Sequence, residues 1–219
     1  MDSPLVDGVP IWIASTDAGL RHSEALEAGE PIAQGLTDAQ GVYRGTYEPL
    51  KTTYETVYAV VGQPGTGVPE GVEPVRGFEL QRYLGTWYEV ARLDHPFERG
   101  LSRITATYGL RDDGGVSVVN RGYDAAKGEW REATGKAYFT GPSDVGQLKV
   151  SFFGPFYGGY NVIALDQQDY QWVMICGPSR DYLWILSRQP ALAPEVLDRL
   201  QTLASGYGFE TDKLIFVQH

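Results

Sequence analysis

Among the residue types that can act as a nucleophile, a general base or a metal ligand, this chain of 219 residues has one cysteine and three histidines. The single thiol belongs to Cys176, and nothing near it in the sequence would lower its pKa and make it reactive. The three histidines, His22, His95 and His219, lie apart and have no serine or carboxylate at the spacing of a catalytic triad or a metal site. We therefore interpret Cys176 as a small buried hydrophobic residue and the histidines as surface residues, and we expect no metal and no cofactor.

One carboxylate lies inside a strand-like stretch, YLGTWYEVAR (residues 83–92). Successive side chains of a strand point to opposite faces, so Glu89 should share a face with Trp87. An acid catalyst acting on a bound lipid would need a nucleophile or a base beside it, and the sequence shows no such pair. Glu89 is therefore expected to be a hydrogen-bonded carboxylate. An enzyme that uses Glu89, Cys176 or a tyrosine is the alternative.

The composition limits the classes of partner. The formal net charge is −10 at pH 7, and residues 1–76 carry 4 basic and 11 acidic side chains. An acidic chain repels phosphate backbones and anionic headgroups, so nucleic acid is not expected as a partner. The N-terminal MDSPLVDGVP lacks the features of a signal peptide, and no run of 18 apolar residues is present. A cytoplasmic protein and a mature chain whose export signal has been removed both fit these observations.

A stretch rich in glycine and proline divides the chain. Residues 63–77 suit a linker or an irregular connection and not the interior of a sheet. Residues 1–62 contain alternating apolar stretches and resemble the small β-sandwich modules of the carboxypeptidase-regulatory or transthyretin-like kind. The strands expected in this module are residues 9–15, 31–37, 41–47 and 52–61. Such a module could engage an unidentified protein partner, with the rest of the chain serving only as structure.

Residues 78–219 have a more regular pattern, with strand-like segments joined by short turns such as RDDGG and GPSRD. The segments are residues 86–93, 102–110, 116–124, 129–140, 147–153, 160–166, 170–176 and 182–188. Short connections predict that neighbouring strands pair as an antiparallel meander. Helical spacing follows in residues 194–206, and residues 213–218 are expected to be a final strand. The pattern predicts an all-β fold: an eight-stranded antiparallel up-and-down barrel with one C-terminal helix, preceded by the β-sandwich-like module.

Three residues have the properties needed to seal one end of such a barrel. Trp87 is large enough to plug it, and Gly85 allows the preceding chain to cross the barrel end where a side chain would collide. If the first and last strands pair, Arg188 comes near Trp87 and can stack its guanidinium on the indole, a contact worth about 0.5 to 2 kcal/mol. This pair would close the seam of the barrel.

The Gly85-Thr86-Trp87 sequence, the arginine of the last strand and the segments GKAYFTGP and CGPSRDYLWILSR resemble the lipocalins. Among them the chain is most similar to the bacterial Blc-type, whose familiar members are outer-membrane lipoproteins, and the likeness covers residues 78–219. It implies a calyx that binds hydrophobic small molecules, in this branch fatty acids or lysophospholipids. It also implies a role in lipid maintenance in the cell envelope, in the periplasm or at the outer membrane. The cysteine that would carry a lipid anchor is missing from this N-terminus.

Alternation from Trp87 and Arg188 identifies the residues that should face the interior, including Ala91 on the first strand. The expected ligand-binding residues are Glu89, Ala106, Tyr108, Asn120, Ala137, Phe139, Phe152, Tyr160, Val162, Trp184 and Leu186. Small residues beside aromatic ones would leave a hollow, in which Asn120, Tyr108 or Tyr160 could hold a headgroup. A packed barrel without a cavity is the alternative, because an eight-stranded barrel can fill itself with side chains.

Overall fold

The structure is a computed structural model that describes residues 10–16, 33–36, 56–61, 66–95, 98–153 and 156–219. The chain forms two compact units. One comprises Met1–Gly65 with Ser151–Tyr157, and the other comprises Thr66–Val150 with Gly158–His219. Most of the residues expected to form the barrel belong to the second unit.

The first part of the chain contains a three-stranded antiparallel sheet with the order β2-β1-β3. Its strands are β1 (Pro10–Thr16), β2 (Ala33–Leu36) and β3 (Thr56–Val61). Trp12 of the central strand pairs with Gln34 on one side and with Val60 on the other. The strand expected at residues 41–47 lies outside the described residues. A β-sandwich-like module over residues 1–62 therefore stays a prediction.

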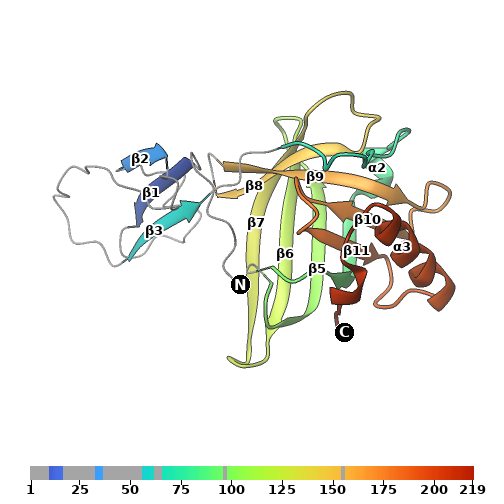
Figure 1. The fold of residues 1–219 in the computed structure, drawn as a ribbon. Helices are drawn as coiled ribbons and strands as arrows, with labels where there is room; N and C mark the ends of the chain where they lie inside the picture. The colour runs from blue at the N-terminus through green and yellow to red at the C-terminus, as the bar shows by residue number, and fades with distance from the viewer. Residues whose placement is uncertain (1–9, 17–32, 37–55, 62–65, 96–97, 154–155) are drawn as a thin grey trace. The chain divides into compact units, whose positions relative to one another are not determined.

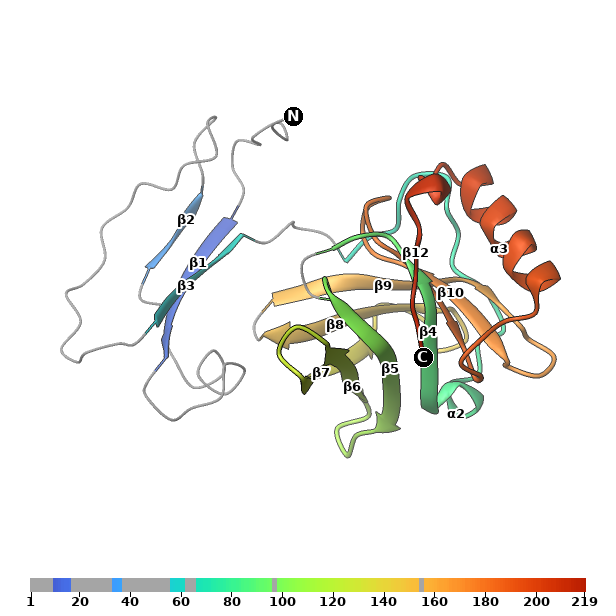
Figure 2. The same ribbon diagram turned by 90° about the horizontal axis from the view of Figure 1, so that it is seen from below.

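The second part of the chain winds into a closed antiparallel barrel (Figures 1 and 2). Its eight strands are neighbours in sequence order, as short connections require, and β11 pairs with β4 to close the barrel. The strands are β4 (Gly85–Arg92), β5 (Leu101–Leu110), β6 (Val116–Asp124), β7 (Glu129–Phe139), β8 (Gln147–Phe153), β9 (Phe156–Leu165), β10 (Trp172–Cys176) and β11 (Leu183–Ser187). The short strand β12 (Ile215–Phe216) also pairs with β4. The predicted eight-stranded up-and-down barrel is confirmed.

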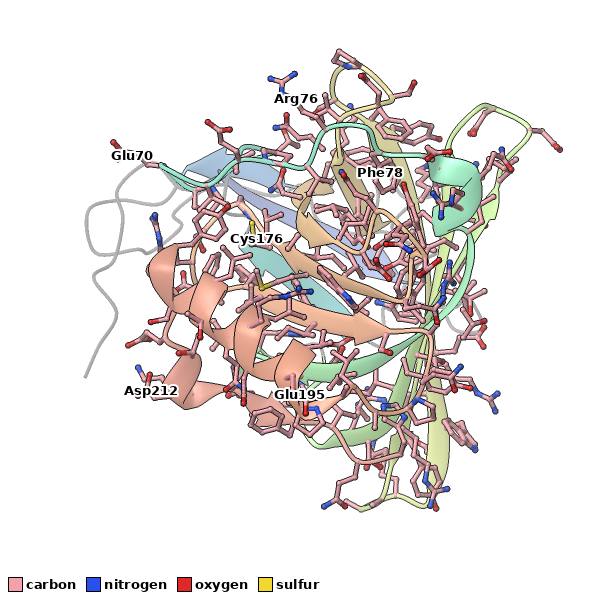
Figure 3. The ribbon with its side chains drawn as sticks, turned by 90° about the vertical axis from the view of Figure 1, so that its right-hand side faces the viewer. Glu70, Arg76, Phe78, Cys176, Glu195 and Asp212 are labelled. Atoms are coloured by element: carbon pink, nitrogen blue, oxygen red, sulfur yellow. The ribbon has the colours of Figure 1, made fainter. Side chains whose placement is uncertain are left out.

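One amphipathic helix, α3 (Pro194–Gly206), covers the outside of the barrel beside β10 and β11 (Figure 1). Its buried residues, Leu200 and Ala204, belong to one core cluster with Cys176 of β10, which is labelled in Figure 3. The helix has the bounds predicted from the apolar spacing, because proline is favoured at the first helical position and the apolar positions repeat up to its end. Among the described residues, no helix combines the length and the apolar composition that crossing a membrane requires.

A β-bulge in the closing strand pair changes which side chains face the interior. Leu186 of β11 pairs with Glu89, whereas Ile185 pairs with Ala91, so β4 has one extra residue at Val90. Ala91 and Ile185 both lie in the core cluster that contains the buried residues of α3. The prediction that Ala91 faces the interior is therefore wrong, because the bulge reverses the alternation after Glu89.

Residues 66–77 follow an irregular path and pack along the barrel. Val72 is 5% exposed and belongs to the same core cluster as α3. The N–H of Val75 donates to the carbonyl oxygen of Val162 (2.8 Å), and the N–H of Gly146 donates to that of Val75 (2.9 Å). The path is irregular, as the glycine and proline content predicts, but these contacts make the segment a part of the barrel unit and not a free linker.

Candidate ligand-binding barrel

The closed end of the barrel is built around Trp87, near the start of β4. Its side chain is fully buried, and its indole Nε1 donates a hydrogen bond to the carbonyl oxygen of Tyr83 (2.8 Å). Tyr83 is the last residue of the short helix α2 (Leu80–Tyr83), which precedes β4. The guanidinium carbon of Arg188 lies 3.8 Å from the centroid of the Trp87 ring. The stacking expected from the pairing of the first and last strands is present in the structure.

Arg188 also holds the chain that crosses the closed end. Its Nη1 donates to the carbonyl oxygen of Thr86 (2.9 Å), and its Nη2 donates to those of Arg82 (2.8 Å) and Leu84 (2.9 Å). Gly85 at this crossing has a φ of +92°, and a Cβ placed there would lie 3.5 Å from Arg188 Nη1. Glycine is needed here because of the backbone conformation, and the expected collision with a side chain does not occur.

Three buried tyrosines form a layer of hydroxyl groups next to Trp87. The hydroxyl oxygens of Tyr83 and Tyr160 are 2.5 Å apart, and the hydroxyl of Tyr160 donates to that of Tyr108 (2.8 Å). Burial raises the pKa of Tyr108 to about 12 and raises the pKa values of Tyr83 and Tyr160 well above their usual value. The layer therefore stays neutral at physiological pH and offers no charge to an anionic headgroup.

The interior beside these tyrosines is almost filled. The cavity there has a volume of about 10 Å³, which is close to the minimum that one water molecule needs. Aromatic and small aliphatic side chains line it, among them Phe78, Tyr108, Ala137 and Tyr160. Phe78, labelled in Figure 3, comes from the segment before α2 and packs edge-on against Phe139, with the ring centroids 6.0 Å apart. At its closed end the barrel is thus filled with side chains.

The structure distributes the expected ligand-binding residues over the barrel interior. The buried ones are Glu89, Ala106, Tyr108, Ala137, Val162 and Leu186, and the half-buried ones are Asn120, Phe139, Phe152, Tyr160 and Trp184. Asn120 pairs with Ala106 across β5 and β6, and its Oδ1 is buried with no hydrogen-bond partner among the described residues. An acceptor is thus available to a hydrogen-bond donor of a ligand. The ligand-binding role of these residues stays a prediction.

A buried ion cluster, which strand alternation does not indicate, surrounds Glu89. Arg92 Nη1 donates to Glu89 Oε1 (3.1 Å), and Arg92 Nη2 donates to the carbonyl oxygen of Glu98 (2.9 Å). The carboxylate of Glu98 contacts His95 Nε2 (2.9 Å) and accepts a hydrogen bond from Trp184 Nε1 (3.2 Å). The expectation that His95 lies on the surface is wrong: it is 2% exposed, because its ring packs against Trp184, with the centroids 5.1 Å apart.

The two carboxyl groups of the cluster have pKa values shifted in opposite directions. Burial raises the pKa of Glu89 well above its usual value, and the Glu98 charge raises it further against the effect of Arg92. Burial also acts to raise the pKa of Glu98, but the contacts with His95 and Trp184 outweigh it and lower this pKa. Glu89 is therefore protonated more easily than Glu98. In the sequence, the signal for this cluster is a pair of opposite charges three residues apart, Glu89 and Arg92. The bulge after Glu89 turns these two side chains to the same face of β4.

Residues 78–219 match the family model described as a lipocalin-like domain. The chain belongs to the lipocalin family. This lipocalin is 54% identical over 170 residues to the outer membrane lipoprotein Blc of Escherichia coli (strain K12), an alignment that covers 78% of this chain and 96% of that protein. It is 57% identical over 152 residues to the Blc lipoprotein of Vibrio cholerae, over 69% of this chain and 89% of that one. The resemblance to the Blc-type lipocalins is thereby confirmed.

A solved lipocalin-like fold supports the same architecture. Insecticyanin from the tobacco hornworm Manduca sexta superposes with a TM-score of 0.56 at 20% identity, over 70% of this chain and 87% of that one. At this identity the likeness concerns the fold alone. Together with the family match, the closed barrel supports the binding of small hydrophobic ligands by this lipocalin.

The thiol of this lipocalin lacks the properties of a nucleophile. Cys176 is fully buried, and burial raises the pKa of its thiol to about 12. The reactive form of cysteine is the thiolate, which such a pKa disfavours at neutral pH. The interpretation of Cys176 as a buried hydrophobic residue is confirmed, and the family match indicates no catalytic family.

Proposed function

We propose that this lipocalin binds single-chain lipids, fatty acids or lysophospholipids, inside its barrel and carries or stores them. The observation that carries the proposal is a closed barrel with a mainly apolar inner face, sealed at one end by Trp87 and Arg188. The buried Oδ1 of Asn120, which has no hydrogen-bond partner in the described part of the chain, adds one polar group suited to a lipid headgroup or a glycerol hydroxyl.

The energetics of burial favour an acyl chain. Each buried methylene contributes roughly 0.8 kcal/mol, so a chain of about sixteen carbons supplies on the order of 12 kcal/mol of gross driving force. Association costs several kcal/mol of lost translational and rotational freedom. Micromolar affinity or better therefore needs no contact between charges.

The filled closed end limits the space in which such a chain could lie. About 10 Å³ beside Tyr108 and Tyr160 is too little for an acyl chain. We therefore place the lipid in the part of the interior beyond the tyrosine layer, near Asn120 and Ala106. The ligand would contact the tyrosine hydroxyls only at its inner end.

The location of the protein is part of the same proposal. The relatives at 54% and 57% identity are named outer membrane lipoproteins. We propose that this chain also acts in the cell envelope, where it would maintain lipids. Fractionation of cells that express the native gene should recover the protein with the envelope, and recovery in the cytoplasm would contradict this part.

One pair of variants tests the barrel as the binding site. Asn120→Trp should fill the interior beyond the tyrosine layer and weaken the binding of a fluorescent fatty acid at least tenfold. Val119→Trp is the matched control, because the neighbouring residue of a strand points to the other face. Native mass spectrometry of the purified protein should also detect co-purified lipid. Unchanged affinity in Asn120→Trp with an intact fold would show that the lipid binds elsewhere.

A further inference from the structure

The strand register places the hairpin of β6 and β7 at one end of the barrel. Gly85 at the start of β4 pairs with Tyr108 near the end of β5, and Val116 at the start of β6 pairs with Ala137 near the end of β7. These residues lie at the closed end. The turn between β6 and β7 therefore lies at the other end, the mouth of the barrel, and Figure 1 shows it opposite α2.

An aromatic pair lies on the outer face of this hairpin. Tyr123 of β6 and Trp130 of β7 are cross-strand partners, and their ring centroids are 5.4 Å apart. Val118 of β6 is 3% exposed and faces the interior, so alternation turns Tyr123 and its partner outward. Trp130 is 46% exposed. A large aromatic surface is thus open to an occupant beside the mouth.

An arginine lies over each of these two rings. The guanidinium carbon of Arg121 is 4.3 Å from the centroid of the Trp130 ring, and that of Arg103 is 5.3 Å from the centroid of the Tyr123 ring. Both arginines are exposed. A guanidinium that stacks by its face keeps its in-plane N–H groups for other partners, and these match phosphate oxygens. We call Arg103, Arg121, Tyr123 and Trp130 the mouth patch.

The backbone at Arg103 is bent in a way that serves this patch. Its φ is +52°, in the left-handed region that residues other than glycine rarely adopt. Arg103 lies at a bulge between Ser102 and Thr105, and its N–H donates to the carbonyl oxygen of Gln218 (2.7 Å). A bulge can redirect a side chain, and here the side chain of Arg103 lies over Tyr123.

The charge of the mouth patch differs from that of the whole chain. Residues 1–76 account for seven of the ten net negative charges, since they carry 4 basic and 11 acidic side chains. In the hairpin, Lys127 of the turn adds to the two arginines, and Glu132 is the acidic residue at an outward position. Asp124 and Glu129 pair with each other at inward positions. The outer face is therefore locally positive and complements phosphate groups.

We propose that the mouth patch docks the protein on a phospholipid membrane, with the two aromatic rings among the headgroups and the two guanidinium groups on phosphates. Tryptophan and tyrosine favour the membrane interface because their rings combine an apolar body with a polar edge. A protein partner could use the same residue types. The position of the patch favours a lipid surface, because the closed end is filled and a lipid must reach the interior through the mouth. The choice of occupant thus rests on the proposed function.

Binding to vesicles tests the occupant. The full-length protein is mixed with vesicles of equal parts phosphatidylethanolamine and phosphatidylglycerol, and the bound fraction is measured by flotation over a lipid titration. We expect saturable binding, which Trp130→Ala should weaken about tenfold because part of one aromatic contact is lost. Leu110→Ala is the matched control, since Leu110 is an exposed apolar residue at the closed end. No vesicle binding, or an equal loss in both variants, would overturn the proposal.

A second pair of variants tests the role of charge. Arg121→Gln should weaken vesicle binding about fivefold, the contribution of one arginine near an anionic surface. Arg111→Gln removes the same charge from an exposed arginine at the closed end, so it should bind as the wild type does. Equal losses in the two variants would show that binding follows the net charge of the chain and not the mouth patch.

Quenching by brominated phospholipids tests whether Trp130 itself reaches the lipid. The chain has five tryptophans, and bromine quenches the fluorescence of those that lie in contact with the lipid. Trp130→Phe keeps an aromatic ring and should bind vesicles within threefold of the wild type, but with less of its fluorescence quenched. Equal quenching in Trp130→Phe and the wild type would show that this residue does not contact the membrane.

The barrel variant separates docking from the proposed function. Asn120→Trp should weaken the binding of a fluorescent fatty acid and leave vesicle binding unchanged, whereas Trp130→Ala should do the reverse. If vesicle binding is lost in Asn120→Trp and kept in Trp130→Ala, lipid inside the barrel holds the vesicles and the docking proposal is wrong. If Trp130→Ala loses vesicle binding and Asn120→Trp keeps its fatty-acid affinity, the docking proposal stands and the barrel proposal fails.

Discussion

The closed end of the barrel depends on two side chains that do different work. Trp87 fills the space between the strands, and Arg188 covers its ring while donating hydrogen bonds to the carbonyl oxygens of Arg82 and Leu84, which precede β4. These carbonyls belong to a segment without strand partners of its own, so one guanidinium satisfies groups that would otherwise be left unpaired. The stacked pair thus joins the first strand, the last strand and the crossing segment.

The loss of this indole should be costly. We expect Trp87→Ala to lower the free energy of unfolding by roughly 3 to 5 kcal/mol, because it removes a large buried aromatic side chain and leaves a cavity. Urea denaturation followed by circular dichroism measures the change. Trp130→Ala is the control, since Trp130 is exposed and its loss should cost less than about 1 kcal/mol. A loss below 1 kcal/mol in Trp87→Ala would contradict the role of this residue in the closed end.

The buried Glu89 should make stability depend on pH. Its pKa is raised in the folded protein, so the native state binds this proton more tightly than the unfolded chain does. The tighter binding of this proton stabilises the folded protein at pH values below the usual pKa of glutamate. The stabilisation is lost as the pH rises from that value through the raised pKa of Glu89 in the native state. Glu89→Gln should therefore be more stable than the wild type at pH 8, while the two differ less at pH 4. Urea denaturation at both pH values is the measurement, and a less stable variant at pH 8 would show that Arg92 keeps Glu89 ionised.

Among the elements of the fold, α3 and the bulge in β4 determine which residues of the barrel wall face the outer core and which face the interior. The bulge turns Ala91 to the outer core with Ile185, where the buried residues of α3 also lie. Arg92 thereby joins Glu89 in the ion cluster. The extra residue at Val90 therefore places Ala91 in the apolar layer outside the barrel and Arg92 in the polar cluster inside it.

The helix should protect the thiol beneath it. Leu200→Ala is expected to lower the free energy of unfolding by about 2 to 5 kcal/mol and to speed the reaction of Cys176 with a maleimide, since both residues lie in one core cluster. Leu203→Ala on the exposed side of α3 should change stability by no more than about 0.5 kcal/mol and leave the labelling rate unchanged. Equal labelling rates in the two variants would show that α3 does not cover Cys176.

At the scale of the whole molecule, the barrel unit begins before the first barrel strand. Val72 is buried in the core that contains α3, and Val75 exchanges hydrogen bonds with Gly146 and Val162. The unit that we expect to fold by itself therefore includes residues 66–77. We propose that the module predicted over residues 1–62 is separate from lipid binding and serves a protein partner.

Two truncations test this division. Removing residues 1–62 should leave the barrel's unfolding free energy and its affinity for a fluorescent fatty acid unchanged. Removing residues 1–77 should lower the unfolding free energy by about 2 kcal/mol or more, because it exposes the surface that Val72 covers. Calorimetry and fluorescence titration of the two proteins give the comparison. An equal loss of stability in both truncations would mean that the first 62 residues support the barrel.

The sequence by itself determined the eight-stranded meander and the bounds of α3, and the closure of such a meander into a barrel predicted the pairing of Trp87 with Arg188. These features follow from local alternation, turn chemistry and short connections, which depend on neighbouring residues in the chain. Only the tertiary structure decided that Ala91 faces outward, that His95 is buried and that residues 66–77 pack on the barrel. A bulge shifts the register without a strong local signal, and the burial of a polar side chain such as that of His95 depends on partners such as Trp184 that are distant in sequence. The same reason explains why the filled closed end appears only in three dimensions: the space left between side chains depends on how all eight strands pack together.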